Sequence, residues 1–200
     1  MQPKSCSRYL LTVALGVIAG GSGMSSDRRS HPLACRDNAR KQVLPRGTAN
    51  RLPLFVRHAI ALLPFIEDRQ VVILPRAVKV LEYLVSWGYS REIAAETVNE
   101  LADLAEFTID HHFPIFINAE SPNYIRILAS WERGNSPDEA ARVLASEIYH
   151  EYRHAACGEE EWEALAAQIS LLKRWRAEGL LRIADPYIAS KELQRRNLGR

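Results

Sequence analysis

Five consecutive residues in the C-terminal half of the chain combine the side chains that metal-dependent hydrolysis requires. They are His150, Glu151, Tyr152, Arg153 and His154. Two histidines four residues apart lie on one face of a helix, close enough to bind the same tetrahedral metal ion. The glutamate after the first histidine then lies beside the open coordination position, where it can accept a proton from water. The spacing predicts a zinc site with His150 and His154 as ligands and Glu151 as general base.

The residues before the motif predict the helix that this geometry needs. Ser136 suits an N-cap and Pro137 the first helical position, and Ser136 with Glu139 predicts a capping box. Apolar residues then recur at helical spacing: Ala140, Val143, Leu144, Ile148 and Tyr152. Gly158 predicts the end of the helix. Both histidines would then lie in its last two turns.

A third ligand is expected from a second helix that follows at once. Its start is rich in acids, Glu159 to Glu163, and its small residues Ala164, Ala166 and Ala167 allow it to approach the first helix closely. Its buried stripe is predicted from helical spacing: Trp162, Leu165, Ile169 and Leu172. Acids in a first turn also complement the helix dipole, so only one of them is expected to bind metal.

Glu163 is the predicted third ligand, with Glu160 or Glu161 as the fallback. Cys157 is a further alternative, because it follows His154 by three residues on the same side of the helix. A third ligand from the same helix would be unusual in a zinc site, which favours the carboxylate.

These residues resemble the zincin superfamily. The sequence HEYRH, followed by a helix that begins E-x-E-A-x-A-A, is similar to the glutamate-liganded gluzincin pattern. The short interval between the two is similar to compact bacterial zinc peptidases, including those that cleave phage-type repressors, and is far shorter than in the large gluzincins. The resemblance covers residues 113–172 and implies zinc bound by His150, His154 and Glu163, with Glu151 as general base.

The function expected from this site is peptide-bond hydrolysis by a zinc metallopeptidase of the HExxH type. A non-catalytic zincin-like domain that binds zinc or a protein partner is the alternative. A third interpretation, a helical interaction domain with an accidental motif, predicts no bound metal. The expected partner of the enzyme is a peptide or protein substrate.

The rest of the chain predicts a predominantly helical α+β fold. Within the apolar residues 54–66, which Pro64 interrupts, a short helix that covers His58 is expected. Helices are also expected over residues 75–87 and 90–107, with a polar helix from Ser190 after a turn at Asp185-Pro186. Residues 70–74 and 113–117 are strand candidates. For residues 124–131 a hairpin strand is slightly favoured over a helix capped at Ser121.

A zincin-like core places an edge strand beside the active-site helix, and substrate pairs with that edge as an added strand. Residues 113–118 are the candidate edge, with Ile115 and Ile117 as candidate substrate-binding residues. The expected fold class is therefore a zincin-like core with a small β-hairpin or edge strand beside the HExxH helix.

The N-terminal residues predict a leader and an arm before a single metallopeptidase domain at 53–200. Residues 1–26 combine a basic start, a short apolar run and small residues, which is typical of a cleaved signal peptide. Residues 27–52 lack periodicity and suit a flexible arm. Export to the periplasm or outside the cell would leave Cys35 and Cys157 as a pair able to form a disulfide. A buried N-terminal helix in a cytoplasmic protein is the alternative.

The composition is that of an ordinary soluble globular protein. Of the 200 residues, 47% are hydrophobic and 25% are charged, and the net charge is +2. Lysines and arginines are scattered, which argues against a nucleic-acid partner. The apolar run near the N-terminus is too short for a stable membrane span.

Overall fold

The computed structural model describes residues 52–74, 78–86, 88–95, 106–109, 112–134, 136–182 and 184–199. The predicted signal peptide at 1–26 and residues 27–51 of the predicted arm lie outside the described residues. Within the described part the fold is predominantly helical with a small sheet, as the α+β prediction requires.

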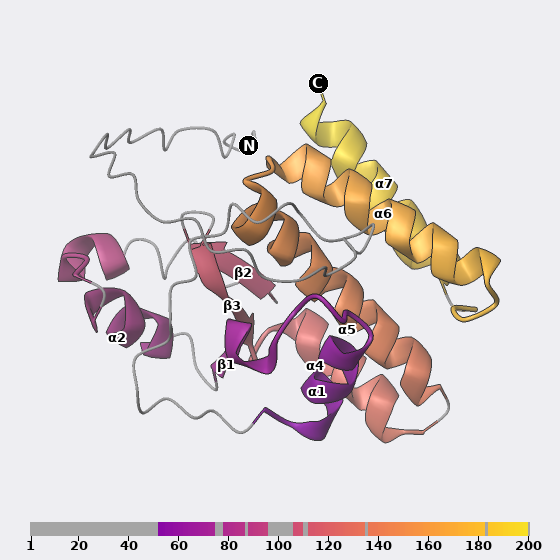
Figure 1. Ribbon diagram of the computed structural model, residues 1–200, viewed down its shortest axis with the longest axis horizontal. Helices are drawn as coiled ribbons and strands as arrows, with labels where there is room; N and C mark the ends of the chain where they lie inside the picture. Colours follow the sequence, from indigo (N-terminus) through magenta and orange to yellow (C-terminus); the bar gives the residue numbers. More distant parts are fainter. Residues whose placement is uncertain are drawn as a thin grey trace, which may run out of the picture. The chain divides into compact units, whose positions relative to one another are not determined.

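The described strands form a mixed sheet in the order β1-β3-β2 (Figure 1). Strand β1, Val71–Leu74, pairs parallel to β3, His112–Asn118, and Val71 lies opposite Ile115. Strand β2, Glu106–Ile109, pairs antiparallel to the other side of β3. The two strands predicted from sequence, at residues 70–74 and 113–117, are thus confirmed.

The position of β3 within the sheet overturns its predicted role. Because β3 pairs with a strand on each side, its backbone has no free edge for a substrate. The side chains of Ile115 and Ile117 are 0% exposed, so neither can contact a substrate. The prediction that these residues bind substrate at an edge is wrong. Among the described strands, β2, which packs against the HExxH helix, is the sheet edge on that side.

Strand β2 also falls where the sequence predicted the end of a helix. The predicted helix does begin after Ser90, whose hydroxyl accepts the N–H of Ile93 at 3.3 Å, and residues 91–95 are helical. Residues 106–109 are extended, so the helix does not reach Phe107. A stretch that alternates Phe107 with Ile109 beside a buried partner strand satisfies strand spacing as well as helical spacing.

Residues 122–132 form helix α4, Pro122–Glu132, and not the hairpin strand that was favoured. The Ser121 hydroxyl accepts the backbone N–H of Tyr124 at 3.0 Å, and Pro122 occupies the first turn. Tyr124 and Ile127 are buried one helical turn apart. The cap and the proline therefore decide the structure over the alternating apolar residues.

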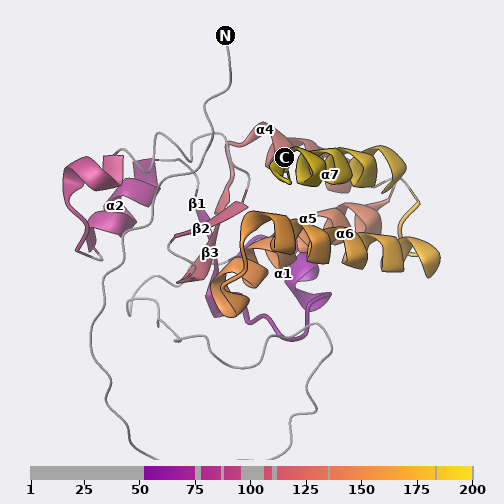
Figure 2. The ribbon, with the colours of Figure 1, turned by 90° about the horizontal axis from the view of Figure 1, so that it is seen from above.

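The long helix α5, Pro137–Tyr152, is the element around which the described residues pack. Helix α1, Leu54–Ala61, helix α4, helix α6, Glu161–Ala177, and the sheet all contact it (Figures 1 and 2). Its buried side chains form much of the core: Ala140, Ala141, Leu144, Ala145, Ile148, Tyr149 and Tyr152. The HExxH motif thus lies at the end of a helix that, among the described residues, is largely buried.

Two further helices complete the described structure. Helix α2 spans Val78–Ser86, and helix α7 spans Ala184–Leu198 and packs against α6. Helix α7 begins earlier than the predicted Ser190, so Asp185 and Pro186 belong to its first turn. Proline is tolerated there because the first N–H groups of a helix have no intrahelical acceptor. Within the described residues no helix is both long and apolar enough to cross a bilayer.

Candidate metal centre

The HExxH residues lie where helix α5 changes its winding. The helix continues beyond Tyr152 as a π-helical turn, η2, Arg153–Cys157, and ends at Gly158 as the sequence predicts. Gly158 has φ +66°, a left-handed conformation that costs glycine little. His150 lies in the last α-helical turn and His154 in the π-helical turn. Such wider turns occur most often at functional sites.

The side chains of His150, His154 and Glu161 converge on one point. Oε2 of Glu161 lies 3.2 Å from Nε2 of His150 and 3.1 Å from Nε2 of His154, and the two nitrogens are 3.1 Å apart. A tetrahedral zinc ion with bonds of about 2.0–2.2 Å holds its ligand atoms about 3.3 Å apart. The observed triangle fits a zinc ion with almost no adjustment.

The structure brings the fallback Glu161 to the histidines, and not the first choice, Glu163. Glu163 faces the other way because it belongs to the capping box of α6, where its Oε2 accepts the N–H of Glu160 at 3.2 Å. The Glu160 side chain completes that box. The capping box therefore occupies both Glu160 and Glu163 and leaves Glu161, the first residue of α6, directed at α5.

The backbone orients His154 for metal binding. Its Nδ1 lies 2.6 Å from the carbonyl oxygen of Glu159, which can only accept, so Nδ1 donates its proton there. The other ring nitrogen, Nε2, faces Glu161. Burial alone would lower the pKa of His154, but the hydrogen bond with Glu161 and the nearby charge of Glu151 raise it. Among the described residues, Nδ1 of His150 is buried without a partner.

The two carboxylates of the site differ in protonation. Burial would raise the pKa of Glu161, but hydrogen bonds from both histidines hold it well below its usual range, so Glu161 is ionised. Burial raises the pKa of Glu151, whose Oε1 lies 4.0 Å from Nε2 of His150. Metal-assisted proton transfer needs one ionised carboxylate to bind the metal and a second, more basic carboxylate to accept a proton. Glu161 has the first property and Glu151 the second.

Sequence reasoning missed a clamp that holds the π-helical turn. The guanidinium of Arg153 binds the carboxylate of Glu159 through two hydrogen bonds, one of them from Nε to Oε2 at 2.8 Å. The same guanidinium lies 5.8 Å from the ring centre of Tyr149. Since Glu159 also supplies the carbonyl that orients His154, the clamp fixes the position of a candidate metal ligand. The sequence signal for this ion pair was the presence of opposite charges, Arg153 and Glu159, on either side of Gly158.

Two other predicted details differ in the structure. The side chain of Ser136 makes no capping hydrogen bond, and Glu139 accepts the N–H of Arg182 at 2.7 Å, so the predicted capping box is absent. Trp162 is 49% exposed under the guanidinium of Arg195, so it does not belong to the buried stripe. The rest of that stripe is buried as predicted: Leu165, Ile169 and Leu172.

Cys157 is disulfide-bonded, so its sulfur is not available as a thiolate ligand. The predicted partner, Cys35, lies outside the described residues. The carboxylate of Glu161 therefore completes the group, which agrees with the expectation that the third ligand comes from a separate helix.

No family model, curated protein or solved structure matches this chain. The chemistry of the site therefore follows from its own residues. These are two imidazoles and one ionised carboxylate aimed at a common point, with a second buried carboxylate beside them.

Proposed function

We propose that this protein is a zinc-dependent metallopeptidase with a zincin-like site. The observation that carries the proposal is the convergence of Nε2 of His150, Nε2 of His154 and Oε2 of Glu161. Three protein ligands leave a fourth tetrahedral position open, which is the arrangement of catalytic and not of structural zinc sites. When bound there, zinc would supply a water of lowered pKa and a Lewis acid for the scissile carbonyl.

Glu151 is the proposed proton carrier. Its carboxylate is buried, precedes His154 by three residues on α5 and lies against His150. In the reaction it accepts the proton of the attacking water and then delivers that proton to the leaving amine. Its burial favours this role, because a desolvated carboxylate is a stronger base than an exposed one.

The substrate backbone is proposed to pair with strand β2. This strand is the described sheet edge that packs against α5, and it runs antiparallel to β3. A peptide added to such an edge gains main-chain hydrogen bonds without any requirement on its side chains. The proposal therefore moves the substrate edge from β3, which is paired on both sides, to Glu106–Ile109.

We further propose that the protein works in an oxidising compartment after export. The disulfide at Cys157 supports this, because disulfides persist in the periplasm and outside the cell and are rare in the cytosol. The leader-like composition of residues 1–26 is the second support.

The test compares zinc-loaded wild type with Glu151→Gln on a peptide library. The variant is expected to keep zinc and lose at least about a hundredfold in kcat, because it lacks the proton acceptor. Glu163→Gln is the matched control, since it makes the same change on the helix that carries Glu161, and it should retain activity. Full proteolysis by zinc-bound Glu151→Gln would contradict the proposal. A zinc-loaded wild type that binds peptides but cleaves none would instead indicate a non-catalytic zincin-like domain.

A further inference from the structure

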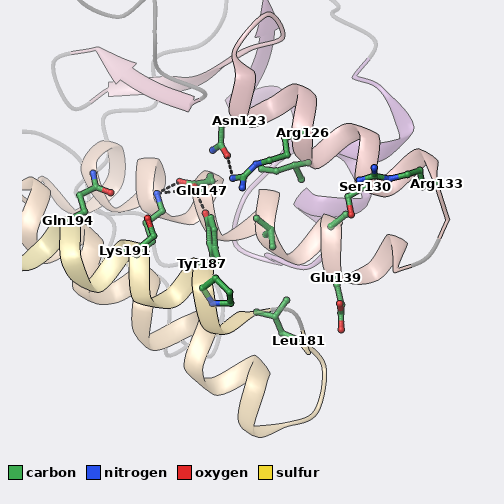
Figure 3. Close-up of a pocket in the computed structure, with 15 residues that line it drawn as sticks. Asn123, Arg126, Ser130, Arg133, Glu139, Glu147, Leu181, Tyr187, Lys191 and Gln194 are labelled. Atoms are coloured by element: carbon green, nitrogen blue, oxygen red, sulfur yellow. Dashed lines mark hydrogen bonds and ion pairs between the residues drawn. The ribbon is translucent and has the colours of Figure 1, made fainter.

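A pocket of about 530 Å³ lies between helices α4, α5 and α7 (Figure 3). One end is formed by Glu147, Lys191 and Gln194. Glu147 lies one helical turn before His150 and Glu151 on α5, and Nε2 of Gln194 lies 3.5 Å from Oε1 of Glu161. The pocket therefore ends beside the three proposed zinc ligands.

The opposite end contains a buried carboxylate oxygen that lacks a donor. Glu139 is only 9% exposed, and its Oε1 accepts the N–H of Arg182. Its Oε2 is buried and, among the described residues, has no hydrogen-bond partner. A buried carboxylate oxygen is stable only with a donor, so this end of the pocket favours an occupant that carries an N–H group.

The wall formed by α4 presents two positive charges to the same pocket. Arg126 and Arg133 both line it, two helical turns apart. Arg126 makes a hydrogen bond to the neutral Oδ1 of Asn123 at 2.7 Å, and no described carboxylate forms an ion pair with either guanidinium. In Figure 3, Arg126 reaches toward the end where Glu147 and Lys191 meet, and Arg133 lies toward the end with Glu139.

The negative charge of Glu147, at the end of the pocket that it forms with Lys191 and Gln194, is already neutralised. Glu147 accepts hydrogen bonds from the Tyr187 hydroxyl and from Nζ of Lys191 at 3.0 Å. Among the described residues that line the pocket, the charges without an ion-pair partner are thus the guanidiniums of Arg126 and Arg133 and the carboxylate of Glu139. An occupant that satisfies the pocket carries carboxylates toward α4 and an N–H donor toward Glu139.

The length of the pocket identifies the class of occupant. From Glu139 to Glu147 the floor rises about 12 Å along α5, which is the length of about four residues of extended peptide. Arg126 and Arg133 are about 10 Å apart along α4, or about three extended residues. Side chains of an extended peptide alternate between two faces, so two acidic side chains two positions apart point the same way, about 7 Å apart, within reach of the long side chains of Arg126 and Arg133. The backbone of such a peptide supplies the N–H.

We propose that this pocket, which we call the α4–α5–α7 pocket, binds an acidic segment of the peptide substrate, with Arg126 and Arg133 as specificity-determining residues. This inference rests on the proposed peptidase function, since it assigns the substrate class of that enzyme. The occupant approaches the metal centre along α5, and its acidic residues are held on the α4 side. Glu139 binds its backbone and does not select side chains.

The test measures binding in the Glu151→Gln background, so that it does not depend on turnover. Fluorescence anisotropy compares two labelled octapeptides that carry either two glutamates or two glutamines two positions apart. The glutamate peptide is expected to bind about tenfold more tightly. The added double substitution Arg126→Ala/Arg133→Ala should abolish this difference. The control Arg57→Ala/Arg91→Ala removes the same charge from exposed sites elsewhere and should preserve it.

Two further variants sharpen the result. Arg126→Glu/Arg133→Glu should reverse the preference toward a peptide with two lysines. Glu139→Gln should weaken the glutamate and glutamine peptides equally, because it replaces an acceptor for the backbone. Equal binding of the two peptides, or a preference that survives Arg126→Ala/Arg133→Ala, would overturn the inference.

Activity measurements separate this inference from the proposed function. If zinc-loaded wild type cleaves the glutamate and glutamine peptides with equal kcat/KM and binds them equally, the peptidase stands and the pocket assignment fails. If it cleaves neither but the binding preference and its loss in Arg126→Ala/Arg133→Ala are observed, the pocket assignment stands and the peptidase fails.

Discussion

At the residue scale, the site depends on which acid of a short run faces the histidines. Five residues, Glu159 to Glu163, contain four glutamates, and three of them have separate tasks. Glu159 binds Arg153, Glu163 caps its own helix and Glu161 joins the histidines. Because each side chain is committed to a different partner, the glutamates cannot replace one another.

A second residue-scale feature is the buried ion pair below the site. Burial would raise the pKa of Glu147, but the charge of Lys191 and the hydrogen bonds from Tyr187 and Lys191 lower it below the ordinary 4.5, with a smaller effect from His150. A lowered pKa means that the ionised form is stabilised by folding. Its contribution to stability is complete above about pH 4.5 and is lost as the pH falls through the lower, folded-state pKa.

Glu147→Gln tests this ion pair. Loss of the charge leaves Lys191 partly buried without a counter-ion, so the free energy of unfolding should fall by about 2 kcal/mol at neutral pH. The difference from wild type should shrink below about pH 4.5, where Glu147 becomes protonated in the unfolded chain, and should vanish as the pH falls through its lower pKa in the folded protein. Urea unfolding of both proteins from pH 3 to 8 measures this difference in the free energy of unfolding. A difference that stays constant down to pH 3 would show that the charge of Glu147 is not what stabilises the fold.

At the element scale, the metal centre depends on how closely α6 approaches α5. Ala164 is fully buried on α6, which packs against α5, and lies one turn after Glu161. Small residues at such a position allow two helices to pack at short range. The sequence predicted this close approach, and the burial of Ala164 supports it.

Ala164→Leu should disturb both stability and metal binding. Three added carbons in a packed interface cost about 1–3 kcal/mol, and the displacement of α6 moves Glu161 away from the histidines. We expect lower zinc affinity in a chelator competition, together with a lower melting temperature. Ala166→Leu, on the half-buried side of α6, is the control and should change neither by much. Zinc affinity equal to wild type in folded Ala164→Leu would argue against this dependence.

Local signals in the sequence predicted the elements that carry the chemistry. The apolar periodicity from Ala140 to Tyr152 and the glycine at 158 were enough to place both histidines at the end of one helix. The sequence could not show whether Glu161 or Glu163 faces the histidines, because this depends on the residue at which α6 begins. A shift of two residues in the start turns a side chain by about 200° around the helix.

Long-range features were beyond the sequence for a different reason. A short apolar run such as residues 113–117 identifies a strand candidate but does not say whether its backbone pairs on one side or on both. The sheet order β1-β3-β2 brings together segments far apart in the chain. The α4–α5–α7 pocket was likewise unforeseen, because Glu139 had a plausible local role as a cap and its actual partner, Arg182, is distant in sequence.

At the scale of the whole molecule, one helix links every functional feature. The face of α5 that starts at Glu139 lines the pocket, continues through Glu147 and ends at the metal centre. Helix α7 forms the opposite wall and reaches Glu161 through Gln194. In the proposed enzyme, a substrate that enters along α5 would meet Arg126 and Arg133 before it meets Glu151 and the proposed zinc ligands.

The most direct test of this account is zinc stoichiometry, measured by elemental analysis on purified wild type, His150→Ala, Glu161→Ala and Glu163→Ala. Wild type and Glu163→Ala should each hold about one zinc ion per chain, since three protein ligands define one site. His150→Ala and Glu161→Ala should lose it. Wild type without zinc, or zinc retained in Glu161→Ala and lost in Glu163→Ala, would contradict the metal centre described for His150, His154 and Glu161.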